Sequence, residues 1–226
     1  MTTYKEQSWT GHMITYKQAV DAVGTPSNPS KMPNIALGSS ATHCVTGSKL
    51  RHVEGSVCYA CYALKGFYAM SPAINAGEIR YRKIMESKNN PQPWIDGCTR
   101  IILSKRGPDK NWMRWNDSGD LHGAWHIANI VQVALNTPNV SHWLPTREYK
   151  FVKDYIESGG IIPENLTIRI SAHMVDQSAP DIYGLPKSEV RTTEDATCPS
   201  RFQDNSCGDC RKCWSKEVEV VSYYKH

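Results

Sequence analysis

Residues 112–170 read WMRWNDSGDLHGAWHIANIVQVALNTPNVSHWLPTREYKFVKDYIESGGIIPENLTIRI, and they alternate short apolar runs with longer amphipathic ones. Short apolar runs predict strands, and apolar residues at helical spacing predict helices. The strands are expected at Trp112–Trp115, Ser141–Leu144 and Leu166–Ile170, and the helices at Ala124–Leu135 and Tyr149–Glu157. Strands that alternate with helices favour a parallel sheet covered by those helices.

The flanking sequence continues this pattern in both directions. Two more helices are predicted at Pro72–Lys88 and Pro93–Arg106, and more strands at Asn34–Gly38, Glu189–Thr192 and Val218–Tyr223. About six strands are fewer than the eight of a closed barrel, and 226 residues are fewer than the roughly 250 typical of one. We therefore expect an α/β fold, a partial or open (β/α) barrel of about six parallel strands with helices outside. A doubly wound open sheet is the alternative.

Two segments lack the alternating pattern. Residues 1–32 are polar and end in TPSNPSKMP, so we expect an extended N-terminal arm followed by a single domain at 33–226. Ser39–Met70 is rich in glycine, serine, histidine and cysteine and shows neither hydrophobic period, which is typical of a functional loop.

The composition limits the classes of function. Lysine and arginine number 26 against 22 acidic residues, and this net charge of +4 is scattered, so nucleic-acid binding gets no support. No apolar run approaches the roughly 20 residues of a membrane span, and we expect a cytoplasmic protein without a membrane partner. In a reducing compartment, eight cysteines favour metal binding over disulfides.

Four cysteines near the C-terminus, Cys198, Cys207, Cys210 and Cys213, have the spacing of metal ligands. Two-residue gaps let thiolates converge, and Gly208 permits the tight turn that this requires. Such runs are typical of iron–sulfur clusters, whereas structural zinc more often uses two separated pairs. We expect an iron–sulfur cluster of the 4Fe–4S type, with zinc as the alternative. Because the protein supplies all four ligands, the site should be structural or carry electrons.

A second group, Cys44, Cys58 and Cys61, lies in the loop after the first predicted strand. Three thiolates leave one position open, which lets a cluster iron or a zinc ion bind a small molecule. Alternatively, all seven clustered cysteines could surround one larger site. The other candidates for a fourth ligand are His43, His52 and Cys98. Of these, Cys98 lies on an apolar helix face, which favours a thiol buried in the core.

Three predicted strands end in dense polar sequence. Carboxyl ends of parallel strands lie at one edge of a sheet, where α/β proteins bind ligands, so these side chains should face a common pocket. The candidate catalytic residues are Asp117, Asp120 and His173. The candidate substrate-binding residues are Asn116, Ser118, Arg147, Glu148, Arg169 and Ser171.

The residue types in this group suggest a small acidic substrate or a nucleotide. Arg147 and Arg169 suit a carboxylate or phosphate, and His173 could carry a proton. Each residue also has a structural alternative, such as a helix cap, an ion pair or a satisfied core histidine. Asp120 in particular could cap the helix that begins at Ala124.

Several segments together resemble the phage gene product 88 family. They are CYACYA at 58–63, WNDSGD at 115–120, WLPTREY at 143–149, IRISAH at 168–173 and the C-terminal cysteine cluster. The resemblance spans roughly residues 33–226. It implies a bacteriophage source and a metal held by cysteines, and it names no substrate.

A looser similarity is to radical S-adenosylmethionine enzymes, which place three cluster cysteines in the loop after the first strand of a partial barrel. Cys44, Cys58 and Cys61 also follow the first predicted strand, and the segment 118–120 is similar to the Gly-Gly-Glu segment of those enzymes. The spacing differs, because thirteen residues separate Cys44 from Cys58 where those enzymes have three. S-adenosylmethionine as a cofactor is implied by this similarity alone.

Two hypotheses for the function follow. The first is a phage-encoded iron–sulfur protein that performs redox or radical-type chemistry on a small molecule or nucleotide at the strand ends. The second is a metal-stapled binding protein, with iron–sulfur or zinc, that acts on a host or phage partner without turnover. A zinc-dependent nucleic-acid binder would show steep salt dependence, which the mild charge does not favour. The sequence indicates neither the substrate nor the oligomeric state.

Overall fold

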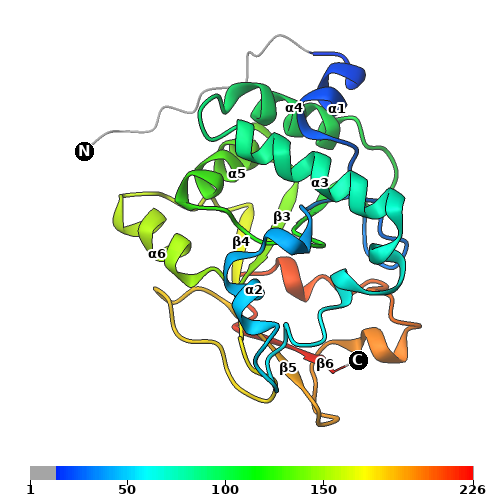
Figure 1. The fold of residues 1–226 in the computed structure, drawn as a ribbon, viewed down its shortest axis with the longest axis vertical. Coiled ribbons are helices and arrows are strands. Elements are labelled where there is room, and N and C mark those ends of the chain that lie inside the picture. Colours follow the sequence, from blue (N-terminus) through cyan, green and yellow to red (C-terminus); the bar gives the residue numbers. More distant parts are fainter. Residues whose placement is uncertain (1–13, 226) are drawn as a thin grey trace.

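Six strands form one sheet in which every neighbouring pair is parallel. The computed structural model describes residues 14–225, and the strand order follows the chain from β1 to β6, which are the two edges of the sheet (Figure 1). The strands are β1 Ala36–Leu37, β2 Trp112–Trp115, β3 Ser141–Thr146, β4 Leu166–Ser171, β5 Lys187–Arg191 and β6 Val220–Tyr224. The expected α/β class and open (β/α) barrel are confirmed.

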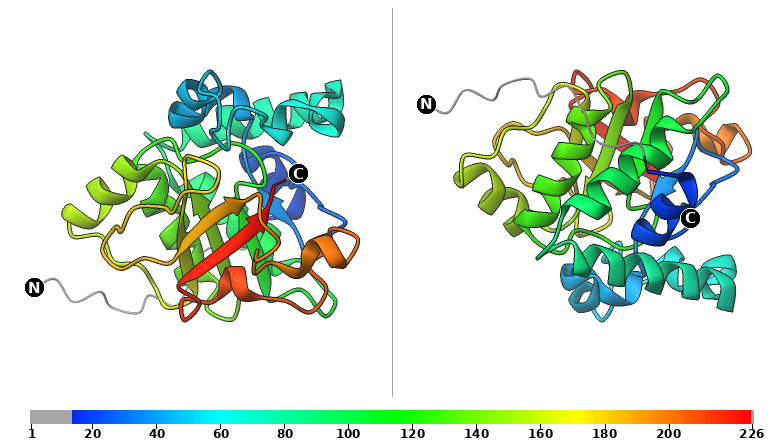
Figure 2. Two further views of the ribbon diagram at one scale, coloured as in Figure 1. Left: turned by 90° about the horizontal axis from the view of Figure 1, so that it is seen from below. Right: turned by 90° about the horizontal axis from the view of Figure 1, so that it is seen from above.

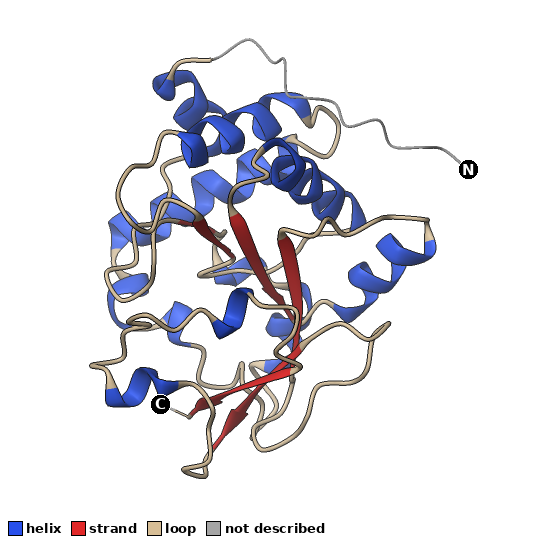
Figure 3. Cartoon of the chain, turned by 180° about the vertical axis from the view of Figure 1, so that it is seen from behind, coloured by secondary structure: helices blue, strands red, loops and turns tan. Residues whose placement is uncertain are grey.

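The main helices connect the first four strands and pack against the sheet (Figure 3). They are α3 Ser71–Glu86, α4 Gln92–Leu103, α5 Ala124–Asn136 and α6 Tyr149–Glu157. In α5 the predicted apolar stripe is buried at Ile127, Ile130, Val131 and Ala134, because these positions share one face of a helix, whereas its fifth member, Leu135, is 42% exposed. Among residues 14–225, no helix has the length and apolar character needed to cross a membrane.

Strand β4 shows how the sequence assigns the two faces of the sheet. Leu166 and Ile170 pack into the main core with the helices. Thr167 and Arg169 alternate with them and donate hydrogen bonds to main-chain oxygens of the segment 212–218. This second face is therefore covered by chain from the connection between β5 and β6, and not by a helix.

A tryptophan cluster seals that second face. Trp214, in the 3₁₀ turn η5 (Lys212–Trp214), lies 5.1 Å from Trp143 and 5.8 Å from Trp112 between ring centroids. Its Nε1 donates to the main-chain oxygen of Met113 at 2.8 Å, which satisfies the indole inside the protein. The cysteine-rich C-terminal segment is thus part of the core.

The N-terminal segment contains a helix where an extended arm was expected, so that expectation is wrong for α1, Tyr16–Val23. Thr15 and Gln18 form a reciprocal capping box that starts the helix. Val23 packs against α4, and a side chain at Gly97 would come within 2.6 Å of it, so glycine permits the close approach. The polar composition hid this short apolar stripe. Residues 1–13 of the predicted arm lie outside the described residues.

The predicted loop after β1 consists largely of short helical turns that cross the carboxyl ends of the strands. In Figure 2 (left) this blue-to-cyan segment lies across the end of the sheet toward which the arrows point. Its elements are η1 Ala41–His43, α2 Val45–Leu50, η2 Tyr62–Leu64 and η3 Gly66–Ala69. The segment therefore covers the edge where ligands were expected.

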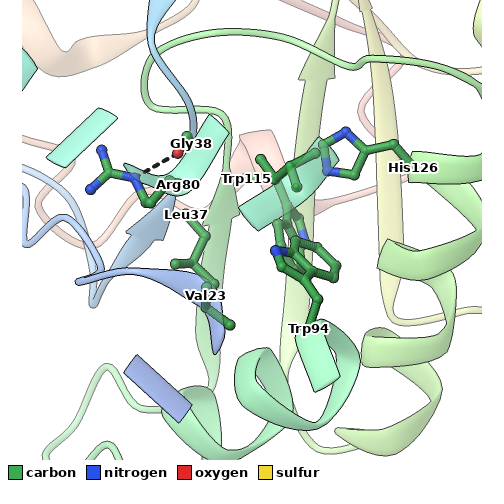
Figure 4. Close-up of a pocket in the computed structure, with 8 residues that line it drawn as sticks. Val23, Leu37, Gly38, Arg80, Trp94, Trp115 and His126 are labelled. Carbon is green, nitrogen blue, oxygen red and sulfur yellow. Dashed lines mark hydrogen bonds between the residues drawn. The ribbon is translucent and has the colours of Figure 1, made fainter. Parts of the chain in front are cut away.

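Behind the strand ends lies a small, mainly apolar hollow of about 220 Å³, shown in Figure 4. Arg80 borders it and fixes the end of β1, donating from Nε to the main-chain oxygen of Gly38 at 2.6 Å and from Nη1 to that of Thr25 at 2.7 Å. His126 is 1% exposed beside it, and burial lowers the pKa of this imidazole to about 3. The hollow is a packing feature of the core.

Candidate functional site

The three cysteines after β1 meet at the start of α2. Cys44 is the N-cap of that helix, and Cys58 and Cys61 lie in the turns that follow it. A Cβ placed on Gly47 would lie 3.7 Å from the sulfurs of both Cys44 and Cys58. The fold therefore brings thiols thirteen residues apart into one neighbourhood.

Glu148 ties this cysteine loop to the end of β3. Its carboxylate is 3% exposed and accepts hydrogen bonds from the main-chain nitrogen and the hydroxyl of Thr46, both at 2.7 Å. The loop also pairs with the end of β4, where Val57 N donates to His173 O at 2.9 Å. Charge-assisted bonds of this kind are stronger than neutral ones, so Glu148 is a principal anchor of the loop.

Asp120 connects the exits of β2 and β3. Its carboxylate accepts from the hydroxyl of Thr146 at 2.6 Å and from the main-chain nitrogens of Arg147 and Leu121 at 2.9 and 2.8 Å. The α5 N-cap is Gly123, so Asp120 does not cap that helix. Burial, followed by the charge of Glu148, raises the pKa of Asp120 to about 6. It can therefore exchange a proton near neutral pH.

Arg147 and His173 complete the polar group at these strand ends. Arg147 donates from Nε to Ala172 O at 3.1 Å, and within residues 14–225 no hydrogen bond from its two terminal nitrogens is found. His173 Nε2 lies 3.0 Å from Arg147 O, so this nitrogen carries the proton, and the ring stacks on Tyr149 at 4.1 Å. Both side chains are half-buried. The Arg147 guanidinium is free to receive an acidic group.

Burial raises the pKa of the Cys44 and Cys58 thiols. The charges of Asp120 and neighbouring thiols add to this effect, while Arg147 and Arg51 oppose it at Cys58. Nucleophilic cysteines have lowered pKa values, so these thiols do not fit that role. A bound metal cation would instead hold them as thiolates.

The exit of β2 packs against aromatic residues of the same loop. Asn116 has φ +54°, and its buried Nδ2 has no hydrogen-bond partner in the described part of the chain. Asp117 is 2% exposed, and its Oδ2 accepts from the Tyr68 hydroxyl at 3.3 Å while its Oδ1 has no such partner. Ser118 is used internally, because its hydroxyl donates to Ser39 O at 2.6 Å.

A second hollow, with about 480 Å³ of space, lies between the cysteine loop, α3 and the exits of β1 and β2. Ser40, Thr42 and Tyr68 supply hydroxyl groups to its lining, and Leu64 and Ile74 supply apolar surface. Ala63, the second residue after Cys61, is part of the lining of this hollow. This space includes open solvent, and some of its lining residues lie within two positions of Cys44 and Cys61 along the chain.

The four C-terminal cysteines sit along β6 and the turn that follows η4 (Pro199–Phe202). Cys198 N donates to Ser222 O at 2.9 Å, and Cys213 Sγ lies 3.3 Å from the hydroxyl of Tyr223. Cys210 N donates to Cys207 O at 3.0 Å, closing a turn in which Gly208 has φ +48°. The left-handed conformation explains why glycine occupies this position.

Arginines surround this second group. Burial raises the pKa of the Cys207 thiol, as do the neighbouring thiols, while Arg114 and Arg211 oppose the shift. Burial also raises the pKa of Cys213, to about 11, with Arg169 acting in the opposite direction. Positive charge next to buried sulfur favours a negatively charged metal–thiolate centre.

Arg169 belongs to this frame, which corrects its assignment as a substrate-binding residue. It is 0% exposed. Its guanidinium donates to the main-chain oxygens of Lys187, Lys212, Cys213, Ser215 and Val218 at 2.8–3.4 Å. Ser171 is also used structurally, since its hydroxyl accepts from Ser188 at 3.0 Å across the β4–β5 pair.

The seven clustered thiols fall into two groups, because the sulfur neighbours that perturb each thiol all come from its own group. All eight cysteines are free. Cys98 is 0% exposed in the main core, so it does not complete the three-cysteine shell. His43 Nε2 pairs with Glu78 at 2.8 Å, a carboxylate contact that metal-binding histidines also make through their second ring nitrogen.

Within residues 14–225, no group of three or more histidine, cysteine, aspartate or glutamate side chains is arranged to hold a metal ion. Zinc needs its sulfurs about 2.3 Å from a single centre, so the thiols would have to move together to bind it. A cluster of several irons and sulfides spans a wider gap. The donor set, sulfur alone in both groups, is the one that such clusters use.

Sequence reasoning missed several residues that shape the two sites. Thr46, Arg51 and Tyr62 belong to the loop of the first group, and Arg114 and Tyr223 act on thiols of the second. Tyr62 could have been noticed because it follows Cys61. The role of Arg114 depends on which face of β2 it occupies, and this was not considered.

A protein-family model described as Gene product 88 matches residues 15–216. The matched stretch includes α1, all seven clustered cysteines and β1 to β5. No curated protein matches the chain, and no solved structure does.

Proposed function

The chain belongs to the phage gene product 88 family, and from this premise we propose that it is an iron–sulfur protein whose reactive centre is held by Cys44, Cys58 and Cys61. The family description names no activity, so the site must carry the proposal. Its main support is that three thiols, two of them with pKa values raised by burial, sit among ionisable groups at the carboxyl ends of a parallel sheet.

The open fourth position makes this centre suitable for chemistry. Three protein thiolates leave one iron able to bind an oxygen or nitrogen atom of a small molecule. Arg147 would receive an acidic group of that molecule, such as a carboxylate or a phosphate. Asp120, with its pKa near 6, and His173 would hold or move protons beside it.

We infer a redox or radical-type reaction on a small molecule or nucleotide, since electron transfer is the chemistry that such clusters supply. S-adenosylmethionine is one molecule that could take the open position. Only the position of the three cysteines after β1 favours that choice, and the family match does not add to it.

The four-cysteine site would hold a second cluster or a zinc ion. Because the chain supplies four thiolates there, the site is coordinatively closed. Its thiols are packed with Trp143 and Trp214, so the metal would fix the segment that seals the inner face of the sheet. Free thiols in both groups suit the reducing cytoplasm of a host cell.

Anaerobic reconstitution tests the proposal. Protein loaded with iron and sulfide should contain both elements at two sites, measured by iron and sulfide counts and by EPR after reduction. Cys58→Ser should remove the signal of the loop site alone, Cys210→Ser that of the C-terminal site alone, and Cys98→Ala neither. Protein that retains only zinc under these conditions would overturn the proposal.

One observation favours the second hypothesis, a metal-stapled binding protein without turnover. Large apolar side chains are exposed along the cysteine loop and the start of α3, an arrangement typical of contact surfaces. They are Val45, Val53, Tyr59, Tyr62, Phe67, Met70 and Ile74. If Phe67→Ser and Met70→Ser abolish phage fitness while Asp120→Asn and Arg147→Met preserve it with metal bound, the binding function is favoured.

A further inference from the structure

Arg114 lies between the two cysteine sites. It occupies β2, on the face opposite the helices, and its guanidinium carbon sits 4.7 Å from the ring centre of Trp143. Trp143 packs with Cys213 in the tryptophan cluster. From this position its charge acts on Cys207 of the second group, and its hydrogen bond to Tyr62 reaches the loop of the first.

An unbroken series of contacts joins one site to the other. Tyr62, which follows Cys61 in the loop, accepts a hydrogen bond from Arg114 Nη2 at 3.4 Å. Arg114 Nη1 donates to the Met32 sulfur at 2.8 Å. Lys31, the residue before Met32 in the chain, accepts a hydrogen bond through its main-chain oxygen from Cys207 N at 2.9 Å. Arg114 is therefore the centre of a route from a thiol of the first group to a thiol of the second.

The Arg114 guanidinium is half-buried, and burial lowers its pKa less than nearby groups, chiefly the Tyr62 phenol and the Asp117 carboxylate, raise it. Among residues 14–225 it forms no ion pair within 4.0 Å, and its buried Nε has no hydrogen-bond partner. Its hydrogen bonds go to a phenol and a thioether, which carry no charge. A guanidinium is always protonated and is stabilised by nearby anions. Metal-bound thiolates would add to the negative charge that Asp117 supplies.

We propose that Arg114 is a positioning residue that couples the two sites, so that the occupancy of the four-cysteine site sets the reduction potential of the three-cysteine site. This inference rests on the proposed iron–sulfur function. Cluster potentials respond to nearby net charge and to hydrogen bonding, and Arg114 transmits both. Coupling between two binding sites is reciprocal, so the loop site should influence the C-terminal site equally.

The test compares reduction potentials of the loop site in redox titrations followed by EPR, using full-length reconstituted protein. Emptying the second site with Cys210→Ser should change the reduction equilibrium of the first by about fivefold, equivalent to about 40 mV. In an Arg114→Met background, Cys210→Ser should leave the reduction potential of the loop site unchanged within error. Arg114→Lys keeps the positive charge but loses the planar guanidinium, and this variant should retain part of the shift.

Two tyrosine variants form a matched pair, one a test of the coupling and the other its control. Tyr62→Phe removes the hydroxyl that Arg114 contacts and should weaken the coupling, whereas Tyr59→Phe, in the turn between Cys58 and Cys61, should leave it unchanged. Full iron at both sites with equal coupling in wild-type, Arg114→Met and Tyr62→Phe proteins would overturn this inference and leave the proposed function standing. Absence of iron from the loop site would overturn both.

Discussion

The two cysteine sites are attached to the same sheet in different ways. The loop site is held at the strand ends mainly by the Glu148 carboxylate, with Asp120 buried beside it, and its outer surface carries exposed aromatic residues. The C-terminal site is built into the sheet's inner face by Arg169 and Trp214, with arginines around its sulfurs. On the proposed function, metals held at the two sites would differ in potential, because carboxylates lie near one site and guanidinium groups near the other. The loop site would then be the one that reacts, and the C-terminal site the one that holds the fold together.

The strongest test of this difference between the two sites is to remove a cysteine ligand from each site in turn. Cys210→Ser should lower the free energy of unfolding by about 4 kcal/mol or more, because a structural metal contributes directly to folding. Cys58→Ser should cost clearly less, since only the loop depends on that site. Chemical denaturation of metal-loaded proteins measures both. Equal losses would show that the loop site is as structural as the other.

Removing the arginine that frames the C-terminal site should have the next largest effect. Arg169→Met leaves five main-chain oxygens without their hydrogen-bond donor. We expect the free energy of unfolding to fall by about 3–5 kcal/mol. Arg106→Met is the control, because that exposed arginine also donates to two carbonyls and should cost no more than about 0.5 kcal/mol. An Arg169 variant as stable as the Arg106 variant would contradict the role assigned to it.

The pH dependence of stability sharpens the comparison at the loop site. The pKa of Asp120 is raised in the folded protein to about 6 from 3.8, so its contribution is fully present below pH 4 and is lost as pH rises through 6. Wild-type protein should therefore lose stability relative to Asp120→Asn between about pH 4 and 6, by roughly 3 kcal/mol at most. Denaturation curves of both proteins across this range test the sign. A constant difference would mean that Asp120 is not buried as described.

Loosening the anchor of the loop should have the smallest effect. Glu148→Gln weakens two hydrogen bonds to Thr46, and we expect a loss of about 2 kcal/mol, with faster hydrogen exchange confined to residues 44–64. Glu157→Gln, which affects an exposed carboxylate bonded to Tyr183, serves as the control and should change little. Faster exchange in the C-terminal segment as well would show that the two sites are held by one network.

The helices and strands with strong hydrophobic periodicity were predictable, because one face of each element packs against the core along its whole length. The bounds of β2 and α6 agree with the prediction, and the stripe of α5 is buried as expected except at Leu135. By contrast, α1 is only eight residues long, and capping at Thr15 and packing on Gly97 stabilise it more than its own composition does. Short helices of this kind depend on tertiary contacts that the sequence does not display.

The candidate sites were predictable to a similar extent. The spacing of the cysteines and the sharing of one sheet edge by Asp120 and Arg147 follow from local sequence and parallel topology. The assignment of Arg169 failed because an arginine in a strand can face either side of the sheet. Its neighbours on that side come from a segment more than forty residues later, Lys212–Ser215, which local reasoning could not place.

The late position of that covering segment affects how the protein matures. Chains fold from the N-terminus as they leave the ribosome, so β2, β3 and β4 can assemble before residues 212–218 are made. Until then, Trp143 and Arg169 face water on a sheet with one uncovered side, a surface prone to self-association. Packing of residues 212–218 over this face would be the last step of assembly, and on the proposed function a metal bound by the four cysteines would secure it.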